Sequence, residues 1–126
     1  MQLKITGLDH AVLVTADVER SLAWYQGVLG LAGERVEEWR RGEAPFPSVR
    51  VDATTIIDLL QGERSGVNVD HLCFVIERQD LAAFAASGGL DIVDGPGPRF
   101  GAQGMGESIY THDPDGNLVE LRHYGS

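Results

Sequence analysis

The chain has 126 residues, 43% of them hydrophobic, which is the size and composition of a single globular domain. Lys and Arg number 10 against 19 Asp and Glu, and the net charge of -9 disfavours nucleic acid and anionic membrane surfaces as partners. The N-terminus lacks a signal-peptide pattern, and no segment is apolar enough to span a membrane. A lone Cys excludes an intrachain disulfide and fits a reducing compartment. We therefore expect one cytoplasmic domain, residues 1–126, with a small-molecule partner.

Two seven-residue segments about 60 positions apart resemble each other. Residues 8–14 (LDHAVLV) and 69–75 (VDHLCFV) share an Asp-His pair and a final Val, and both are rich in apolar and β-branched side chains. Each is typical of a buried strand. A repeat of this kind indicates two copies of one structural unit, paired about a two-fold axis.

Each of these strands is followed by a helical pattern. Asp17 is a suitable N-cap for the first helix, and Gly30 is expected to close it. The apolar face of this helix is expected to contain Val18, Leu22, Tyr25 and Leu29. The second helix is shorter, and its residues 81–84 (LAAF) resemble residues 22–25 (LAWY).

Three further strands are expected in each half of the chain. They are residues 34–40, 48–52 and 56–60 in the first half, and 90–93, 107–111 and 118–122 in the second. Residues 41–47 form a polar turn, whereas residues 94–106, rich in Gly and Pro, are expected to be a loop and a candidate lid. Residues 113–117 (DPDGN) predict a hairpin turn. The predicted fold is α+β, with two pseudo-symmetric βαβββ modules at about 4–61 and about 69–124 that form a mixed sheet.

Four polar side chains occupy equivalent strand positions in the two modules. His10 corresponds to His71, and Asp58 corresponds to Glu120. If the last strand of each module pairs near its first, two imidazoles and two carboxylates converge, a ligand set that suits a divalent metal. Two His and one carboxylate leave coordination positions open for substrate oxygens. The side chain of Asp58 is one methylene shorter than that of Glu120, so Asp58 is expected to reach the metal either directly or through a water molecule.

Strand alternation separates these candidates from their neighbours. Asp9 and Asp70 stand beside the two histidines but point to the opposite strand face, so we exclude both as ligands. A single His or acid in a strand is more often an ordinary hydrogen-bonded or edge residue. The agreement of residue type, strand face and repeat position favours metal ligands instead.

These residues resemble the vicinal oxygen chelate superfamily, which contains glyoxalases, bleomycin resistance proteins and extradiol dioxygenases. In that family, paired βαβββ modules form a cup-shaped sheet around a metal, and the matching ligand positions here are His10, His71 and Glu120. The resemblance also implies a homodimer, and it leaves open whether the site lies within one chain or is shared between two. The segments that carry it are residues 8–14, 21–25, 28–31 and 110–121.

Three positions compare informatively with particular family members. Asp58 stands where glyoxalase I and methylmalonyl-CoA epimerase-like members usually carry Glu or Gln, which places their four-ligand set in doubt. Val14 stands where bacterial glyoxalase I tends to carry an Arg used for glutathione, so a glutathione substrate is disfavoured. Tyr110 matches a position where extradiol dioxygenases place a Tyr beside the substrate oxygen.

Further candidates surround the predicted metal. Tyr110 is a candidate catalytic residue that donates a hydrogen bond or proton to an oxyanion, or else an ordinary strand aromatic. Arg122 is a candidate for binding an anionic substrate, or else a salt bridge at the rim. Arg99, with Phe100 and Gln103, is expected to close over a ligand or to lie in a surface loop. Cys73 lies on the His71 face as a candidate substrate contact, and it is more typical of a small core side chain than of a nucleophile.

The two remaining histidines, His112 and His123, are expected at the surface. The leading functional hypothesis is a metal-dependent enzyme whose substrate chelates the ion through adjacent oxygens, either a dioxygenase or a glyoxalase-like lyase or isomerase. The alternative is a binding protein of the bleomycin resistance type that sequesters an antibiotic or metabolite. The ligand set does not choose among Fe, Mn, Ni, Co and Zn.

Overall fold

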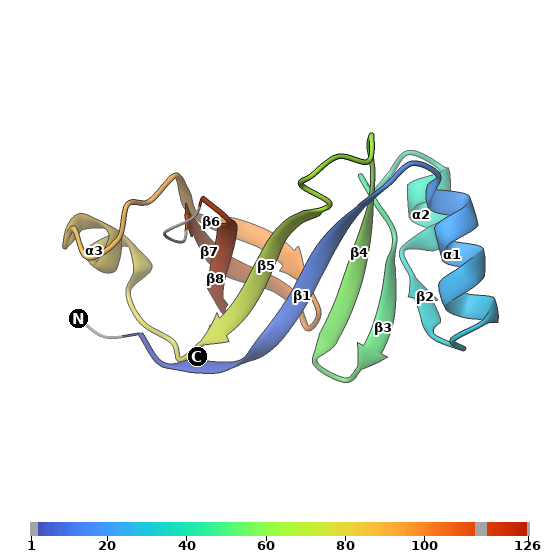
Figure 1. The fold of residues 1–126 in the computed structure, drawn as a ribbon. Coiled ribbons are helices and arrows are strands. Elements are labelled where there is room, and N and C mark those ends of the chain that lie inside the picture. The colour runs from blue at the N-terminus through green and yellow to red at the C-terminus, as the bar shows by residue number, and fades with distance from the viewer. Residues whose placement is uncertain (1–2, 113–115, 126) are drawn as a thin grey trace. The chain divides into compact units, whose positions relative to one another are not determined.

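The structure is a computed structural model that describes residues 3–112 and 116–125 (Figure 1). No helix in these ranges is long and apolar enough to cross a membrane. The elements in chain order are β1 (Ile5–Thr15), α1 (Val18–Gly27), β2 (Ala32–Glu34), α2 (Val36–Arg40), β3 (Ser48–Asp52), β4 (Thr55–Gln61), β5 (Val69–Ile76), α3 (Leu81–Ala86), β6 (Asp94–Gly101), β7 (Gly104–His112) and β8 (Leu118–His123).

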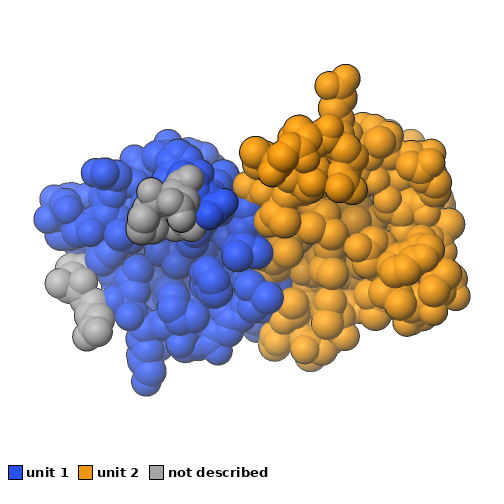
Figure 2. All heavy atoms as spheres, viewed as in Figure 1, with its two compact units in different colours: residues 1–9, 71–126 blue, residues 10–70 orange. Residues whose placement is uncertain are grey.

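The chain divides into two compact units, coloured separately in Figure 2. Unit 1 contains Met1–Asp9 and His71–Ser126, and unit 2 contains His10–Asp70. Strand β1 passes through both units. Its first part lies beside β5 within unit 1, where Glu77 N donates to Lys4 O at 2.9 Å, and its second part pairs with β4 within unit 2.

Unit 2 has the strand order β2-β3-β4-β1. Strand β4 is parallel to β1, with His10 opposite Ile56, and the other two pairs are antiparallel. Helix α1 begins at the predicted cap, where the Asp17 carboxylate accepts a hydrogen bond from Arg20 N at 3.0 Å. Its buried face packs into a core made by Val18, Leu22, Val49 and Leu59.

Unit 1 has the strand order β5-β8-β7-β6 and repeats the same plan. Its first and last strands, β5 and β8, are parallel, whereas β7 pairs antiparallel with both β8 and β6. The core is formed by Ile76, Leu81, Phe84, Ile109 and Leu121. The predicted α+β fold of two βαβββ modules is confirmed, with the short helix α2 added in unit 2.

The prediction of a strand over residues 34–40 is wrong. Strand β2 ends at Glu34, and helix α2 follows at once. Its Glu37 and Arg40 are good helix formers, and their side chains make an ion pair of 2.7 Å across one turn. Trp39 packs from this helix against the core of unit 2. Helix propensity together with this tertiary packing therefore prevails over the weak alternation of the sequence.

The loop expected over residues 94–106 is also wrong, because this segment forms β6 and the start of β7. Residues 90–93, expected to be a strand, precede β6 without forming one. Strand β6 is the last in the strand order, and an edge strand tolerates residues such as Pro96 and Pro98 that have no N–H to donate. The candidate lid is instead a β-hairpin, with Arg99 opposite Gly106.

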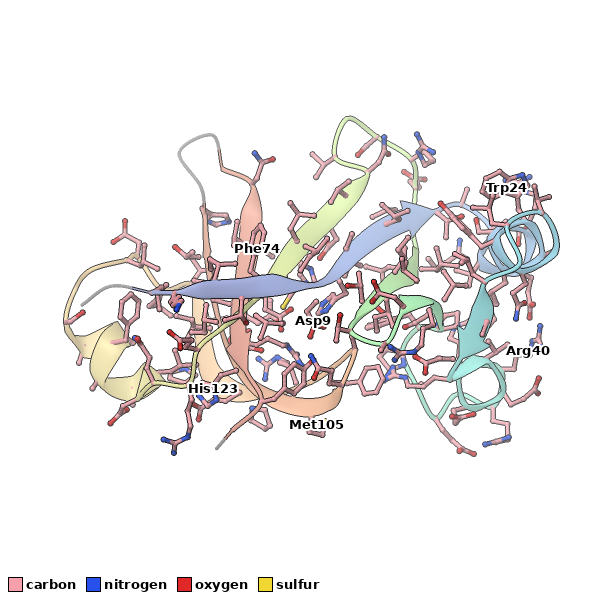
Figure 3. The ribbon with its side chains drawn as sticks, turned by 90° about the horizontal axis from the view of Figure 1, so that it is seen from below. Asp9, Trp24, Arg40, Phe74, Met105 and His123 are labelled. Carbon is pink, nitrogen blue, oxygen red and sulfur yellow. The ribbon has the colours of Figure 1, made fainter. Side chains whose placement is uncertain are left out.

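Smaller boundaries also differ from expectation. Helix α1 ends at Gly27, so the positive φ of 71° at Gly30 belongs to the connection after it. Leu29, expected on the apolar face of the helix, lies outside it and is 51% exposed. Trp24 extends from α1 away from the strands (Figure 3). The strand over 48–52 is confirmed as β3, and β7 and β8 are antiparallel as predicted. Residues 113–115 of the predicted hairpin turn lie outside the described residues.

Candidate metal centre

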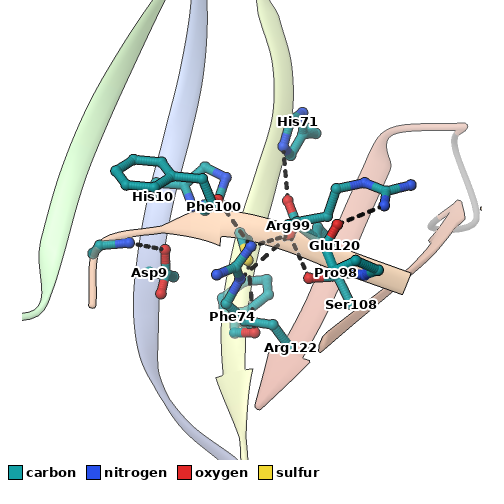
Figure 4. Close-up of polar contacts among 12 residues, drawn as sticks. Asp9, His10, His71, Phe74, Pro98, Arg99, Phe100, Ser108, Glu120 and Arg122 are labelled. Atoms are coloured by element: carbon teal, nitrogen blue, oxygen red, sulfur yellow. Dashed lines mark hydrogen bonds and ion pairs between the residues drawn. The ribbon is translucent and has the colours of Figure 1, made fainter. Parts of the chain in front are cut away.

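Unit 1 brings His71 and Glu120 together. His71 lies near the start of β5, and Glu120 lies on the parallel strand β8. The distance from His71 Nε2 to Glu120 Oε1 is 3.0 Å (Figure 4), and the Glu120 side chain is only 1% exposed. An imidazole nitrogen and a carboxylate oxygen therefore meet within unit 1 at a buried position.

The other oxygen of Glu120 is fully engaged by protein donors. Ser108 Oγ donates to Oε2 at 2.7 Å, and Arg122 donates to the same oxygen through Nη2 at 2.9 Å and Nε at 3.3 Å. These bonds compensate the buried negative charge, which would otherwise be costly. Oε1 is left as the oxygen directed toward His71.

Unit 2 contains the equivalent pair, His10 and Asp58. Their side chains are each 3% exposed, and His10 Nε2 lies 3.8 Å from Asp58 Oδ2. Ser48 Oγ donates to the other oxygen, Oδ1, at 2.5 Å. Each unit thus contains a histidine, a buried carboxylate beside it and a serine that holds one carboxylate oxygen.

The two serines were not predicted as site residues. Ser48 and Ser108 lie about 60 positions apart, so they are equivalent in the repeat in the same way as the histidines and acids. Extending the comparison of the two modules to hydroxyl side chains would have found them. Their bonds orient both carboxylates, which is the usual role of groups behind a metal ligand.

The donor groups fit a divalent metal. His10, His71 and Glu120 each offer one ligand atom of a type that binds Fe, Mn, Co, Ni or Zn. Each carboxylate keeps one oxygen that no serine holds, and each histidine presents Nε2 to a carboxylate of its own unit. These residues therefore have the ligand chemistry that a divalent metal requires, and their role as metal ligands stays a prediction.

Tyr110 lies beside the unit 1 pair. Strand β7 places it opposite Glu120, and its ring meets the His71 ring edge to face with centroids 5.7 Å apart. Burial raises the pKa of Tyr110, and the negative charge of Glu120 raises it further. The phenol is therefore a neutral hydrogen-bond donor at neutral pH.

Arg99 also packs against Tyr110, with its guanidinium carbon 5.6 Å from the ring centroid. It also makes an ion pair of 3.0 Å with Asp94. Both residues belong to β6, so Arg99 is placed by an edge strand and not by the flexible lid that the sequence indicated. Phe100 follows it and is half-buried.

One of the two roles expected for Arg122, an exposed salt bridge at the rim of the site, is wrong. The side chain is fully buried, at 0% exposed, and pairs with Glu120 within unit 1. It also donates from Nη2 to Phe100 O at 3.0 Å and from Nη1 to Tyr124 Oη at 3.2 Å, both in the same unit. Burial by itself would lower the pKa of Arg122, but the charge of Glu120 raises it overall. Arg122 is therefore a permanent cation behind Glu120.

Cys73 is also buried, at 0% exposed, and lies opposite Glu120 in the parallel register of β5 and β8. This placement agrees with a small core side chain. Tyr124, which contacts Arg122 from the end of the chain, was not predicted as a site residue, because no repeat or motif marks its position.

The two histidines expected at the surface differ from each other. His112 is exposed as predicted, whereas the prediction for His123 is wrong because it is only 8% exposed. Its Nδ1 accepts a hydrogen bond from Gly125 N at 3.1 Å, and Nε2 lies 3.3 Å from Glu107 Oε1. The residues that follow β8 fold back over this side of the strand, which alternation within the strand could not indicate.

Comparison with known proteins identifies the family. The profile described as Glyoxalase/Bleomycin resistance protein/Dioxygenase superfamily matches residues 7–121. Virulence protein STM3117 of Salmonella typhimurium is 31% identical over 134 residues, covering 98% of this chain and 88% of that protein. Fosfomycin resistance protein FosX of Mesorhizobium japonicum is 26% identical over 118 residues, covering 93% and 85%.

Among solved structures, the fold is similar to methylmalonyl-CoA epimerase of Streptomyces coelicolor. The TM-score is 0.66 at 21% sequence identity, covering 98% of this chain and 100% of that one. The chain belongs to the Glyoxalase/Bleomycin resistance protein/Dioxygenase superfamily, and the resemblance seen in the sequence motifs is confirmed.

Proposed function

We propose that this chain is a divalent-metal-dependent enzyme acting on a small substrate that chelates the metal through adjacent oxygens. His10, His71 and Glu120 are the proposed metal ligands, and Asp58 is a fourth candidate. The observation that carries the proposal is that a histidine lies beside a buried carboxylate once in each of the two equivalent units. Removing these carboxylates from water costs free energy, and a role in metal binding accounts for that cost better than a role in stability does.

When bound, the metal would act as a Lewis acid toward substrate oxygens or would bind O2 beside them. The protein residues supply the remaining functions. Ser108 and Arg122 hold one oxygen of Glu120, and thereby orient the other, Oε1, toward His71. Tyr110, neutral and in contact with His71, is placed to donate a hydrogen bond to an oxyanion of the substrate.

Two further features support an enzyme of this kind. The net charge of -9 favours a small molecule over nucleic acid as the partner. A phenol that stays protonated beside a proposed metal ligand can donate a hydrogen bond to a substrate oxyanion, which simple sequestration of a ligand does not require. We also propose that the chain works as a homodimer in the cytoplasm, as the family resemblance and the single Cys suggest.

The proposal is tested by metal reconstitution followed by turnover assays. Purified protein is stripped with chelator and loaded separately with Fe(II), Mn(II), Ni(II), Co(II) or Zn(II). Oxygen uptake with catechols tests ring cleavage, methylglyoxal with a thiol tests glyoxalase chemistry, and loss of fosfomycin tests the reaction class suggested by the name of the FosX relative. We expect metal-dependent turnover in one of these assays.

Two variants distinguish an enzyme from a sequestering protein. His71→Ala is expected to abolish turnover, whereas His112→Ala, a change at an exposed histidine of β7, is expected to leave it intact. Tight binding of one of these compounds by metal-free protein, retained in His71→Ala and without turnover, would refute the enzymatic proposal and favour sequestration.

A further inference from the structure

The buried guanidinium of Arg122 occupies a space left by two glycines. A Cβ atom added at Gly101 of β6 would overlap Arg122 Nη1, and one added at Gly106 of β7 would lie 3.2 Å from the same atom. Any other residue at Gly101 would therefore displace the arginine or the strand. Gly101 and Gly106 are thus explained by a tertiary contact, because β6 and β7 form a cradle there for a side chain from β8.

A continuous line of hydrogen bonds leads from this arginine to Asp9. Arg122 Nη1 donates to the Tyr124 hydroxyl, and that hydroxyl donates to Asp9 Oδ2. The other oxygen of Asp9 accepts from Ala102 N at 2.9 Å, and Gln103 N donates to the Tyr124 hydroxyl at 3.2 Å. Asp9 is 0% exposed, so this end of the line is shielded from water, as Arg122 is at the other.

The two ends of this line are tied to proposed ligands. At one end Arg122 holds Glu120 Oε2, and at the other Asp9 directly precedes His10 in the chain. All the bonds in the line lie within unit 1. Buried networks of this kind stabilise one arrangement of their members only when every group is satisfied, so losing one link disturbs the others.

We propose that Arg122, Tyr124 and Asp9 are positioning residues that fix Glu120 as a ligand through Oε1 alone. This inference rests on the proposed function, because it concerns how one proposed metal ligand is presented. The guanidinium and Ser108 together occupy Oε2, so Glu120 cannot turn to offer both oxygens to a metal. Tyr124 and Asp9 keep the guanidinium at that place, and the residues behind a ligand commonly affect metal affinity by about 10- to 100-fold.

Two variants loosen the network without touching a proposed ligand. Tyr124→Phe removes the hydroxyl and keeps the ring, which lies 5.3 Å from the guanidinium carbon of Arg122. Gly101→Ala retains every polar group and displaces the guanidinium by steric contact. The matched controls are Tyr25→Phe on α1 and Gly66→Ala, where an added Cβ meets nothing within 4 Å.

The experiment measures Co(II) binding by metal-free protein, with the visible absorption spectrum of the bound ion as a report on its coordination. Circular dichroism first selects the variants that fold. We expect Tyr124→Phe to weaken Co(II) binding by about 10-fold or more and to change the spectrum, Gly101→Ala to do the same, and both controls to match wild type. If Gly101→Ala does not fold, Tyr124→Phe decides the test.

The results separate this inference from the proposed function. Co(II) bound by wild type and by Tyr124→Phe with equal affinity and an identical spectrum would overturn the positioning role alone. Failure of wild type to bind Co(II) at all would overturn the proposed metal site, and the positioning role with it.

Discussion

Removing the charge of Glu120 should destabilise the metal-free protein by far more than a surface substitution would. Glu120 is 1% exposed and Arg122 is 0% exposed, so Glu120→Gln leaves a buried cation without its counter-charge. Breaking a buried ion pair from one side costs about 3–5 kcal/mol. Three hydrogen bonds to Oε2 would also be weakened or rearranged. We therefore expect Glu120→Gln to lower the free energy of unfolding by about 3–5 kcal/mol.

A double-mutant cycle isolates the contribution of the pair. Arg122→Met should be similarly destabilising, because it removes the guanidinium from a buried carboxylate and leaves Ser108 to hold Oε2. The double variant Glu120→Gln/Arg122→Met should lose less than the sum of the two single changes, with a coupling of about 2–3 kcal/mol. The assay is urea unfolding followed by circular dichroism, with chelator present throughout. Additive effects within about 0.5 kcal/mol would refute the assignment of a buried, mutually compensating pair.

Three other predictions follow from the structure. Leu22 is 1% exposed in the core of unit 2, and Leu22→Ala should lower the free energy of unfolding by about 2–5 kcal/mol in denaturant unfolding. Leu29 is 51% exposed, and the control Leu29→Ala should change that free energy by less than about 0.5 kcal/mol. Burial and the hydrogen bond to Asp9 raise the pKa of Tyr124. The contribution of this phenol to stability should therefore be present below about pH 10 and be lost as the pH rises further. Absorbance at 295 nm should show a tyrosine ionisation above that pH in wild type, and this ionisation should be missing in Tyr124→Phe. A divalent metal that binds the folded chain, present at about 100 times its Kd, should stabilise the fold by about 2.7 kcal/mol. The measurement is thermal unfolding with and without chelator, and identical curves would contradict the prediction.

The repeat allowed most of the architecture to be predicted from the sequence. The Asp-His pairs locate β1 and β5, and the repeat predicts two equivalent modules. The structure adds that the first and last strands of each unit pair in parallel. The same comparison indicated His10, His71, Asp58 and Glu120, which the structure shows as one histidine–carboxylate pair in each unit.

The errors arise where tertiary context decides the local structure. Residues 94–106 have the composition of a loop, but two of their glycines make room for Arg122, a residue far along the chain. Residues 34–40 lack a strong pattern, and the packing of Trp39 against the core of unit 2, which the sequence does not show, favours helix α2 there. The burial of Arg122 and His123 also depends on segments that no alternation within β8 describes.

Metal content per chain tests the central claim most directly. Wild type, His71→Ala, Glu120→Gln and the exposed-site control His112→Ala would be loaded with one divalent metal, desalted and measured by elemental analysis. We predict about one ion per chain in wild type and in His112→Ala, and a clear loss in the other two proteins. Metal content that stays undiminished in both His71→Ala and Glu120→Gln, or that is absent from wild type, would contradict the proposed metal centre.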